Sequence, residues 1–476
     1  MSQNGTQATP QVQTGTAGLW AEVRGSIAGV PRDYTRGPIG RAILLLSIPM
    51  VLEMSMQSLF GVVDVFFVGR LGADAVAVVG LTDSLLMLIF AVGIGLGMGT
   101  TAMVARRIGE GSPERASQTA VQALGVGVAI SLPIGLLGVL FAGDLLRLVG
   151  ASEALTAGGA RFTAIILGGN VTVMLLFLIN AVFRGAGEPA LAMRALWIAN
   201  IINMLLDPVL IFGLGPIPAL GLEGAAIATT VGRGLGVVYQ LWRLAGGRGR
   251  IVVGRAQLVL VPAVMLRLLR VSGIGILQFL ISTASFLGMV RIVALFGETA
   301  VAGYTIAVRV IVFVLLPAWG VGNAAATLVG QNLGAGDASR AERAVWITGF
   351  SNMVFLGAVA VGFVLFPGLL VSPFSSDPEV LRVAADCLRI VSFSYIFWAF
   401  GMVTVMAFNG AGDTATPTWI NLFVFWVLQI PLAYWLSVSL DLGPRGVFIA
   451  IAVSQTALAV VGVSVFRLGR WKTRII

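Results

Sequence analysis

The chain has 476 residues, 58% of them apolar and only 11% charged, with a mean hydropathy of +0.97 and a net charge of +9. A soluble protein of this length needs more charge to cover its surface, so the composition indicates a protein with several membrane spans. A single cysteine, Cys387, and the lack of histidine exclude an intrachain disulfide, a thiolate cluster and the usual imidazole metal site, and we expect no cofactor.

The N-terminal segment 1–37 is polar and rich in Gln, Thr and Gly. It has no apolar stretch of the kind that a signal peptide needs. We therefore expect this segment to be a disordered cytoplasmic tail.

The rest of the chain is divided into long apolar stretches. A hydrocarbon core of about 30 Å needs roughly 20 apolar residues per helix. The stretches do not alternate apolar and polar at every second residue, as the strands of a membrane barrel would. We therefore predict an all-α integral membrane protein with 12 transmembrane helices. They lie near residues 41–66, 75–104, 117–142, 159–183, 190–213, 222–245, 264–295, 300–325, 345–370, 385–407, 417–440 and 446–467.

The sequence contains a repeat with an offset of 225 residues. The matching pieces are 107–116 with 332–341, 183–188 with 408–413, and Gly72 and Ala75 with Gly297 and Ala300. This pattern predicts two six-helix lobes, and an even number of helices in each gives both lobes the same orientation, related by a pseudo-two-fold axis along the membrane normal. The predicted parts after the tail are an N-terminal lobe 38–245, a cytoplasmic linker 246–263, a C-terminal lobe 264–467 and a basic cytoplasmic tail 468–476.

The basic residues are distributed unevenly across the predicted membrane. Of 30 Lys and Arg, 21 fall on the side of the two termini, seven on the other side and two, Arg233 and Arg309, within spans. By the positive-inside rule both termini are expected to be cytoplasmic, in a multi-pass protein of the inner (cytoplasmic) membrane. The positive net charge therefore reflects topology and contact with anionic lipid, and no nucleic-acid partner is expected.

Few charged side chains lie within the spans, and each is a functional candidate because its burial in lipid is costly. The carboxylates are concentrated in the first half, at Glu53, Asp64, Asp83, Asp207 and Glu223. Asn203 and Asp207 are four residues apart and therefore share one helical face. Pro208 frees the backbone carbonyl of Met204 and bends the helix. An amide, a carboxylate and a free carbonyl on one face suit a small hard cation or a proton.

Structural roles are also open for these residues. Asp64 lies five residues before Gly69 and can act as an interfacial helix cap. Glu53 and Asp83 can pair within the bundle, and the pattern favours a structural ion pair or an interface for Arg309. Two Gly-rich segments, Gly109-Glu110-Gly111 and Gly185-Ala186-Gly187, have neither a preceding strand nor a Gly-Lys-Ser/Thr ending, so we expect them to be short turns and not a nucleotide site. If the chain is a transporter, it therefore has to use an ion gradient as its energy source.

Short motifs along both halves of the chain are distinctive when taken together. They are Ser47-Ile48-Pro49-Met50, Val63-Asp64, Ala105-Arg106-Arg107-Ile108-Gly109, Phe183-Arg184-Gly185-Ala186-Gly187, Asn203-Met204-Leu205-Leu206-Asp207-Pro208, Gly224-Ala225-Ala226-Ile227-Ala228-Thr229, Gly330-Gln331-Asn332-Leu333-Gly334-Ala335-Gly336 and Asn409-Gly410-Ala411-Gly412-Asp413. With these motifs the chain resembles the multidrug and toxic compound extrusion (MATE) family from about residue 38 to 467. The pattern is most similar to the DinF-like branch, because the NorM-like branch carries carboxylates in helices seven and eight, where this chain has Gln278 and Arg309.

The resemblance implies an ion site in the N-terminal lobe. It assigns H⁺ or Na⁺ binding to Asp64, Asn203, Asp207 and Thr229, with the carbonyl of Ala225, and it implies that helix one bends as the site loads. Five further polar residues are candidates for the cavity or its gates: Glu53, Asn180, Asp83, Gln278 and Arg309. Glu53 is not part of the family pattern and leaves the proton stoichiometry open.

We therefore expect a secondary active multidrug exporter that exchanges amphipathic, cationic compounds for H⁺ or Na⁺ by alternating access between the lobes. We expect it to act as a monomer in the lipid bilayer. The alternative is a flippase for lipid-linked saccharides with the same two-lobe plan. That function favours an Arg-rich cavity for a pyrophosphate, whereas only Arg233 and Arg309 lie within spans. A channel also remains open, while no catalytic motif supports an enzyme.

Overall fold

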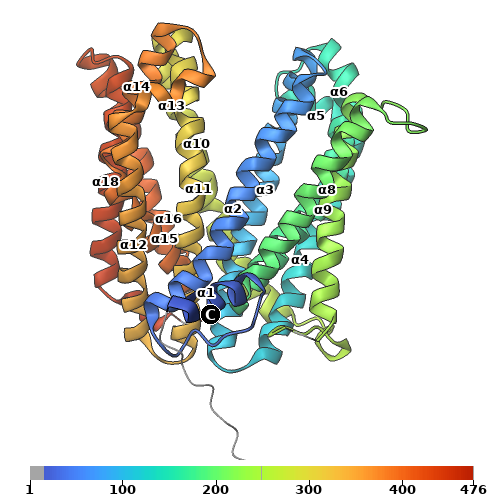
Figure 1. The fold of residues 1–476 in the computed structure, drawn as a ribbon, viewed down its shortest axis with the longest axis vertical. Helices are drawn as coiled ribbons and strands as arrows, with labels where there is room; N and C mark the ends of the chain where they lie inside the picture. Colours follow the sequence, from blue (N-terminus) through green and yellow to red (C-terminus); the bar gives the residue numbers. More distant parts are fainter. Residues whose placement is uncertain (1–15, 248, 475) are drawn as a thin grey trace, which may run out of the picture.

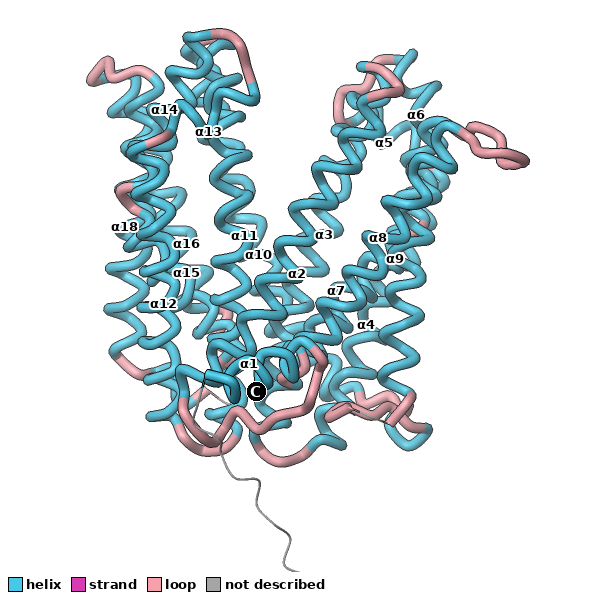
Figure 2. The backbone as a smooth tube through the Cα atoms, in the orientation of Figure 1, coloured by secondary structure: helices cyan, strands magenta, loops and turns pink. Residues whose placement is uncertain are grey.

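The computed structural model describes residues 16–247, 249–474 and 476, and almost all of them are helical (Figures 1 and 2). One isolated β-bridge joins Leu214 to Ile217, and there is no strand in these described ranges. In the first half of the chain the helices are α1 Thr16–Ile27, α2 Ile39–Gly69, α3 Ala73–Gly109, α4 Pro113–Leu140, α5 Ala142–Leu148, α6 Glu153–Gly168, α7 Asn170–Ala186, α8 Pro189–Phe212 and α9 Gly221–Ala245.

The second half repeats this order. Its helices are α10 Pro262–Val293, α11 Glu298–Gly334, α12 Ala338–Leu365, α13 Pro367–Val371, α14 Pro378–Ser392, α15 Tyr395–Gly410, α16 Ala415–Asn421, α17 Ile430–Tyr434 and α18 Pro444–Arg467, with π-helical segments η4 Leu422–Gln429 and η5 Trp435–Ser439 around α17. Short 3-10 segments are η1 Arg255–Gln257, η2 Ala294–Phe296, η3 Ser372–Phe374 and η6 Arg470–Thr473.

The 12 predicted spans all correspond to helical segments. Among the described residues, ten helical stretches are long and apolar enough to cross a membrane, and α14 and α15, bent by 63° at their junction, form an eleventh. The twelfth is α9, which is less apolar because Glu223 and Arg233 lie within it. The prediction of an all-α membrane protein with two six-helix lobes is confirmed.

The 225-residue repeat is visible in the helix boundaries. Helices α3 and α11 each have 37 residues and begin 225 residues apart, and α4 and α12 each have 28 residues with the same offset. Gly187 and Gly412 lie in the turns that follow the matching helices α7 and α15, and both have φ of +80°. That backbone conformation favours glycine because a side chain would clash there, so the turns have been retained together with the helices.

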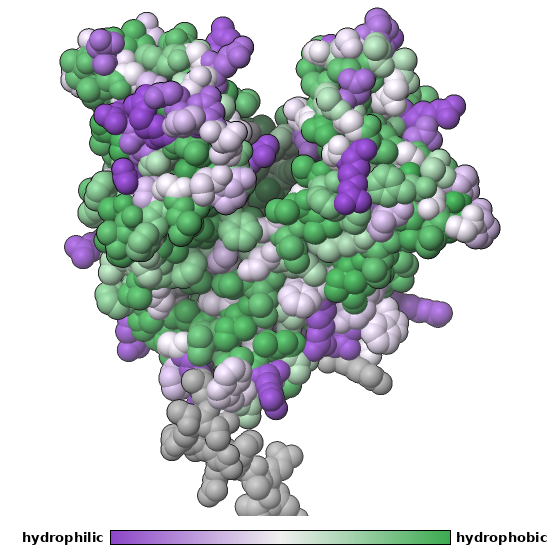
Figure 3. All heavy atoms as spheres, turned by 45° about the horizontal axis from the view of Figure 1, so that its top comes forward, coloured by the Kyte–Doolittle hydropathy of each residue, from purple (hydrophilic) through white to green (hydrophobic). Residues whose placement is uncertain are grey.

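The two lobes form a V (Figure 1). They meet at the end that holds α1 and the C-terminus, here called the inner end, and diverge toward the outer end. Figure 3 shows the hollow that this leaves between the lobes at the outer end. At the inner end α2 packs on α11, and α3 packs on α10 and α11. Gly320 makes the first contact possible, because a β-carbon there would lie 2.9 Å from the Val51 nitrogen.

The prediction of a disordered tail over residues 1–37 is wrong for its second half. Residues 16–27 form α1, and Tyr34 is buried among apolar residues of α2, α11 and α12. The Arg340 guanidinium of α12 donates to the carbonyls of Tyr34 and Arg36. The few apolar side chains of this polar segment are therefore enough to attach it to the inner end. The remaining residues, 1–15, lie outside the described ranges.

The predicted linker and C-terminal tail also pack on the inner end. The Arg250 backbone N–H donates to both carboxylate oxygens of Glu188, at 3.1 Å each. Burial is the main effect on the Glu188 carboxyl, and it raises the pKa despite this hydrogen bond. In the C-terminal tail, Trp471 is fully buried and the Arg474 guanidinium pairs with Asp413 at 3.0 Å.

Candidate functional site

Three of the predicted site residues meet between α8 and α9. The Asn203 side-chain amide lies 3.0 Å from the Thr229 hydroxyl and 3.5 Å from an Asp207 carboxylate oxygen. Asp207 is fully buried, and Asn203 and Thr229 are 2% and 9% exposed. Ala225, one turn before Thr229 on α9, is also buried. We call Asn203, Asp207 and Thr229 the N-lobe polar cluster.

Small residues on α9 bring the two helices together. A β-carbon at Gly232 would lie 2.6 Å from the Ala199 carbonyl oxygen and 3.1 Å from the Asn203 β-carbon. Only a residue without a side chain allows the backbones to approach so closely at this crossing. The close crossing places Thr229 opposite Asn203. Pro208 lies inside α8 directly after Asp207 and cannot donate a backbone hydrogen bond.

Two oxygen atoms of the cluster have no hydrogen-bond donor among the described residues. They are Oδ2 of Asp207 and Oδ1 of Asn203, and both are buried. A buried acceptor without a donor is costly, so such atoms point to a ligand, which here would be a proton or a hard cation. The described residues contain no group of three or more Asp, Glu, His or Cys suited to a metal ion, so a bound cation would depend on mixed carboxylate, amide and hydroxyl oxygens.

Asp64 joins this cluster electrostatically. It is half-buried on α2, and it lies within electrostatic range of Asp207 and of Arg233 on α9. The described side chains give Asp64 no hydrogen bond or ion pair, which argues against the capping role. Asp83 on α3 is exposed and lies within range of Asp64 and Arg233. Arg233 was not among the predicted site residues, although its spacing of four from Thr229 places both on one face of α9.

Glu53 and Asn180 form a separate network nearer the inner end. The Arg184 guanidinium of α7 donates to Glu53 at 3.0 Å, and the Asn180 amide donates to the same oxygen at 3.2 Å. Glu53 is 11 residues before Asp64 on α2, a rise of about 16 Å along a helix. The structure therefore joins Glu53 to Asn180 and Arg184 and separates it from the N-lobe polar cluster.

Comparison with known proteins identifies the chain. The family model described as MatE matches residues 49–209 and, a second time, residues 275–435. The chain belongs to the MATE family. The two matches correspond to the two lobes, so the repeat seen in the sequence is the repeat of the family.

Relatives and solved structures agree with this assignment. The chain is 26% identical to a probable multidrug resistance protein YoeA of Bacillus subtilis, over 89% of this chain and 94% of the relative. It is also 26% identical to an FAD transporter of Shewanella oneidensis, over 89% and 93%. A structure described as an outward-facing conformation of a multidrug resistance MATE family transporter is 26% identical, with a TM-score of 0.86 over 92% of this chain and 98% of the other. The chain is thus a multi-pass membrane transporter and not an enzyme.

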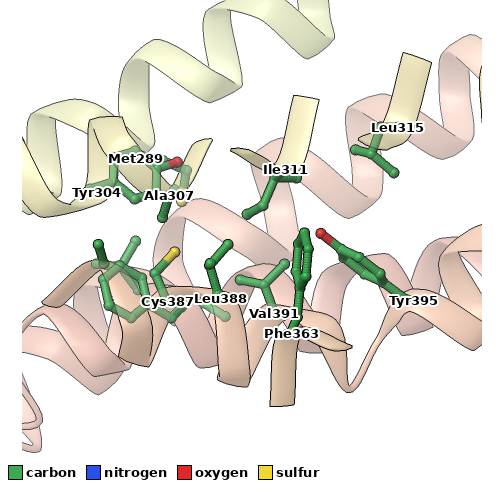
Figure 4. Packing of buried hydrophobic residues seen from close by; sticks show 14 of the residues in the cluster. Met289, Tyr304, Ala307, Ile311, Leu315, Phe363, Cys387, Leu388, Val391 and Tyr395 are labelled. Carbon is green, nitrogen blue, oxygen red and sulfur yellow. The ribbon is translucent and has the colours of Figure 1, made fainter. Parts of the chain in front are cut away.

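The C-lobe of this MATE chain lacks a matching polar cluster among its described residues. At the repeat offset, Asp64 corresponds to Met289 and Asp207 to Leu432. Met289 lies in a buried apolar cluster with Tyr304 (Figure 4). Leu432 packs against that cluster. Of the two remaining C-lobe candidates, Gln278 is buried on α10, and its Oε1 has no hydrogen-bond donor among the described residues. Arg309 is exposed on α11.

Proposed function

We propose that this MATE protein is a secondary multidrug exporter that is driven by H⁺ or Na⁺ and couples through its N-lobe. The main support is the pair of buried oxygen atoms without donors on Asp207 and Asn203, beside Asp64. In the proposed cycle, loading this site with a cation cancels carboxylate charge. The two charge states then favour different arrangements of the lobes, and substrate leaves when the outer end is open.

The proposed orientation has the inner end facing the cytoplasm, because most Lys and Arg of the chain lie there. The hollow between the lobes then faces outward, as in an outward-open transporter. We propose the inner (cytoplasmic) membrane as the location and the monomer as the transporting unit.

Charge favours amphipathic cations as the substrate class. Asp64 and Asp83 are accessible, in surroundings that are otherwise largely apolar. Arg233 compensates for only part of this negative charge. A lipid-linked saccharide would instead bring a pyrophosphate, which requires several arginines. The acid excess therefore favours the exporter over the flippase.

The test is efflux of a panel of labelled compounds from proteoliposomes under an imposed H⁺ or Na⁺ gradient, one ion at a time. We expect amphipathic cations to be moved by one of the two gradients and Asp64→Asn to lower that rate by about tenfold or more. Glu342→Gln, which removes a cytoplasmic-side ion pair with Lys472, serves as the control and retains the wild-type rate. Wild-type efflux by Asp64→Asn would contradict the proposal, as would movement of anionic lipid-linked sugar alone.

A further inference from the structure

The Glu53 network lies outside the proposed coupling site. Glu53 is 1% exposed, and its Oε1 accepts hydrogen bonds from Arg184 and Asn180. The side-chain oxygen Oδ1 of Asn180 in turn accepts a hydrogen bond from the Gln240 side-chain amide at 2.5 Å. Oε2 of Glu53 and Oε1 of Gln240 are buried and have no donor among the described residues. The network thus contains a carboxylate oxygen that is free to take up a proton.

This network lies where the N-lobe touches the C-lobe. The Thr327 hydroxyl of α11 donates to the Arg184 carbonyl at 3.0 Å, and the Gln331 amide donates to the Gly185 carbonyl at 2.9 Å. On α2, Glu53 is one helical turn from Met50, which packs against Gly320 of the same C-lobe helix. Both members of the ion pair are therefore next to contacts that close the inner end.

Arg184 is the one charged group that the described residues bring within electrostatic range of Glu53. The charged groups of neighbouring elements have other partners. Glu22 of α1 pairs with Arg32 and Arg41, and Arg194 of α8 donates to the Ile27 carbonyl. Neutralising Glu53 would thus leave Arg184, whose side chain is only 15% exposed, without a counter-charge. A largely buried charge without its partner is destabilising.

The C-lobe shows that the fold does not need this ion pair. At the repeat offset Glu53 corresponds to Gln278 and Arg184 to Asn409. Both are buried and neutral, and neither polar atom of the Asn409 side chain has a hydrogen-bond partner in the described ranges. The N-lobe alone has opposite charges at these positions, so the charges point to a role beyond packing.

We propose that Glu53 is a second proton-binding site, which controls the closure of the inner end through Arg184. A proton from water binds to Oε2 of the Glu53 carboxylate and gives the neutral acid. Arg184 keeps its positive charge and moves toward water, which draws α7 away from Thr327 and opens the inner end. Return of the proton to water restores the ion pair and the closed contact. The use of this step in transport rests on the proposed function, but the step itself needs neither substrate nor gradient.

The test measures access to the inner interface of the full-length protein in detergent. Ala324 is buried in the contact between α2 and α11, so Ala324→Cys is labelled by a maleimide only when the inner end opens. The native Cys387 is replaced by Ala. Rates are normalised to Ser376→Cys, which is exposed at the outer end, to remove the effect of pH on the thiol itself. The chain with Glu53 intact is expected to label about tenfold faster at about pH 5.5 than at about pH 8.

Three variants make the result decisive. Glu53→Gln is expected to label fast at both pH values, and the double variant Glu53→Gln/Arg184→Gln slowly at both, because it leaves no unpaired charge. Glu342→Gln, which removes an ion pair outside the network, is expected to keep the pH dependence. The proposal is overturned if Glu53→Gln or the double variant retains the dependence, or if Glu342→Gln abolishes it. Should Glu53→Gln fail to fold, the double variant decides alone. Loss of efflux coupling in Asp64→Asn is a separate result, so the two proposals fail independently.

Discussion

In the N-lobe, the outer halves of α2 and α8 carry Asp64 and Asp207, whereas the matching places of the C-lobe hold Met289 and Leu432. The helices around both places have the same order and nearly the same lengths. One lobe nevertheless encloses a polar cluster and the other an apolar core (Figure 4). At these two places, therefore, the duplicated scaffold carries carboxylates in one lobe only.

The comparison extends to the shape of the helices. Helix α8 runs from Pro189 to Phe212 despite Pro208, whereas its counterpart is divided into α16, η4, α17 and η5. The π-helical segments lie beside the apolar cluster of the C-lobe. A buried charge requires a partner or a bound ion, and the described residues of this cluster supply neither.

The largest effect is expected when the apolar core is given a charge. Met289→Asp places a carboxylate among apolar residues without a partner and should lower the free energy of unfolding by about 3 kcal/mol or more. Met289→Leu, which conserves volume, should cost less than about 1.5 kcal/mol. Thermal unfolding in detergent measures both. Equal melting temperatures for the two variants would show that the C-lobe core accepts a charge as readily as the N-lobe.

The second-largest effect is expected at the contact between α2 and α11, where the two lobes meet at the inner end. In Gly320→Leu the new side chain would overlap Met50 and Val51, so the closed inner end should be weakened by about 1–3 kcal/mol. The matched control is Gly61→Ala on α2, where an added β-carbon has no atom within 4 Å. Labelling of Ala324→Cys in each background checks the prediction, and an unchanged rate in Gly320→Leu would contradict it.

A smaller effect distinguishes the matching hydroxyls of the two lobes. Thr229 accepts a hydrogen bond from Asn203, whereas its counterpart Ser454 has no hydrogen-bond partner among the described residues. Thr229→Val should weaken binding of the coupling ion about fivefold, since one hydrogen bond contributes about 1 kcal/mol. Ser454→Ala should leave that affinity unchanged. The ion concentration that gives half-maximal efflux measures both, and equal shifts would remove the distinction between the lobes.

The smallest effect is at the start of α12. The Asp337 carboxylate accepts from the Arg340 backbone N–H, whereas Ser112 at the matching position makes no capping hydrogen bond. Asp337→Ala should cost about 1 kcal/mol and Ser112→Ala less. The hydrogen bond lowers the pKa of Asp337, so its contribution is present above the ordinary Asp pKa and is lost as pH falls through the lowered folded value. Melting curves of Asp337→Ala and the wild type should converge at low pH, and a constant gap would contradict this.

Much of the fold could be predicted from the sequence, because apolar stretches of membrane length and the 225-residue repeat are properties of the chain itself. The face shared by Asn203 and Asp207 could be predicted as well, since helical spacing determines it. Contacts between helices could not. The pairing of Glu53 with Arg184 and the approach of Arg233 to Asp64 depend on how separate helices pack, and the burial of Tyr34 depends on a surface formed by both lobes.

The most direct test of N-lobe coupling compares two transport modes in proteoliposomes containing Asp207→Asn. Gradient-driven efflux requires the coupling ion, whereas exchange of labelled for unlabelled substrate at equal ion concentrations requires only that the lobes alternate. Asp207→Asn should lose the first mode and retain the second, while Gln278→Leu, at a buried polar position of the C-lobe, should retain both. The account would be contradicted if Asp207→Asn showed gradient-driven efflux at the wild-type rate. It would also be contradicted if Gln278→Leu lost gradient-driven efflux while Asp207→Asn kept it.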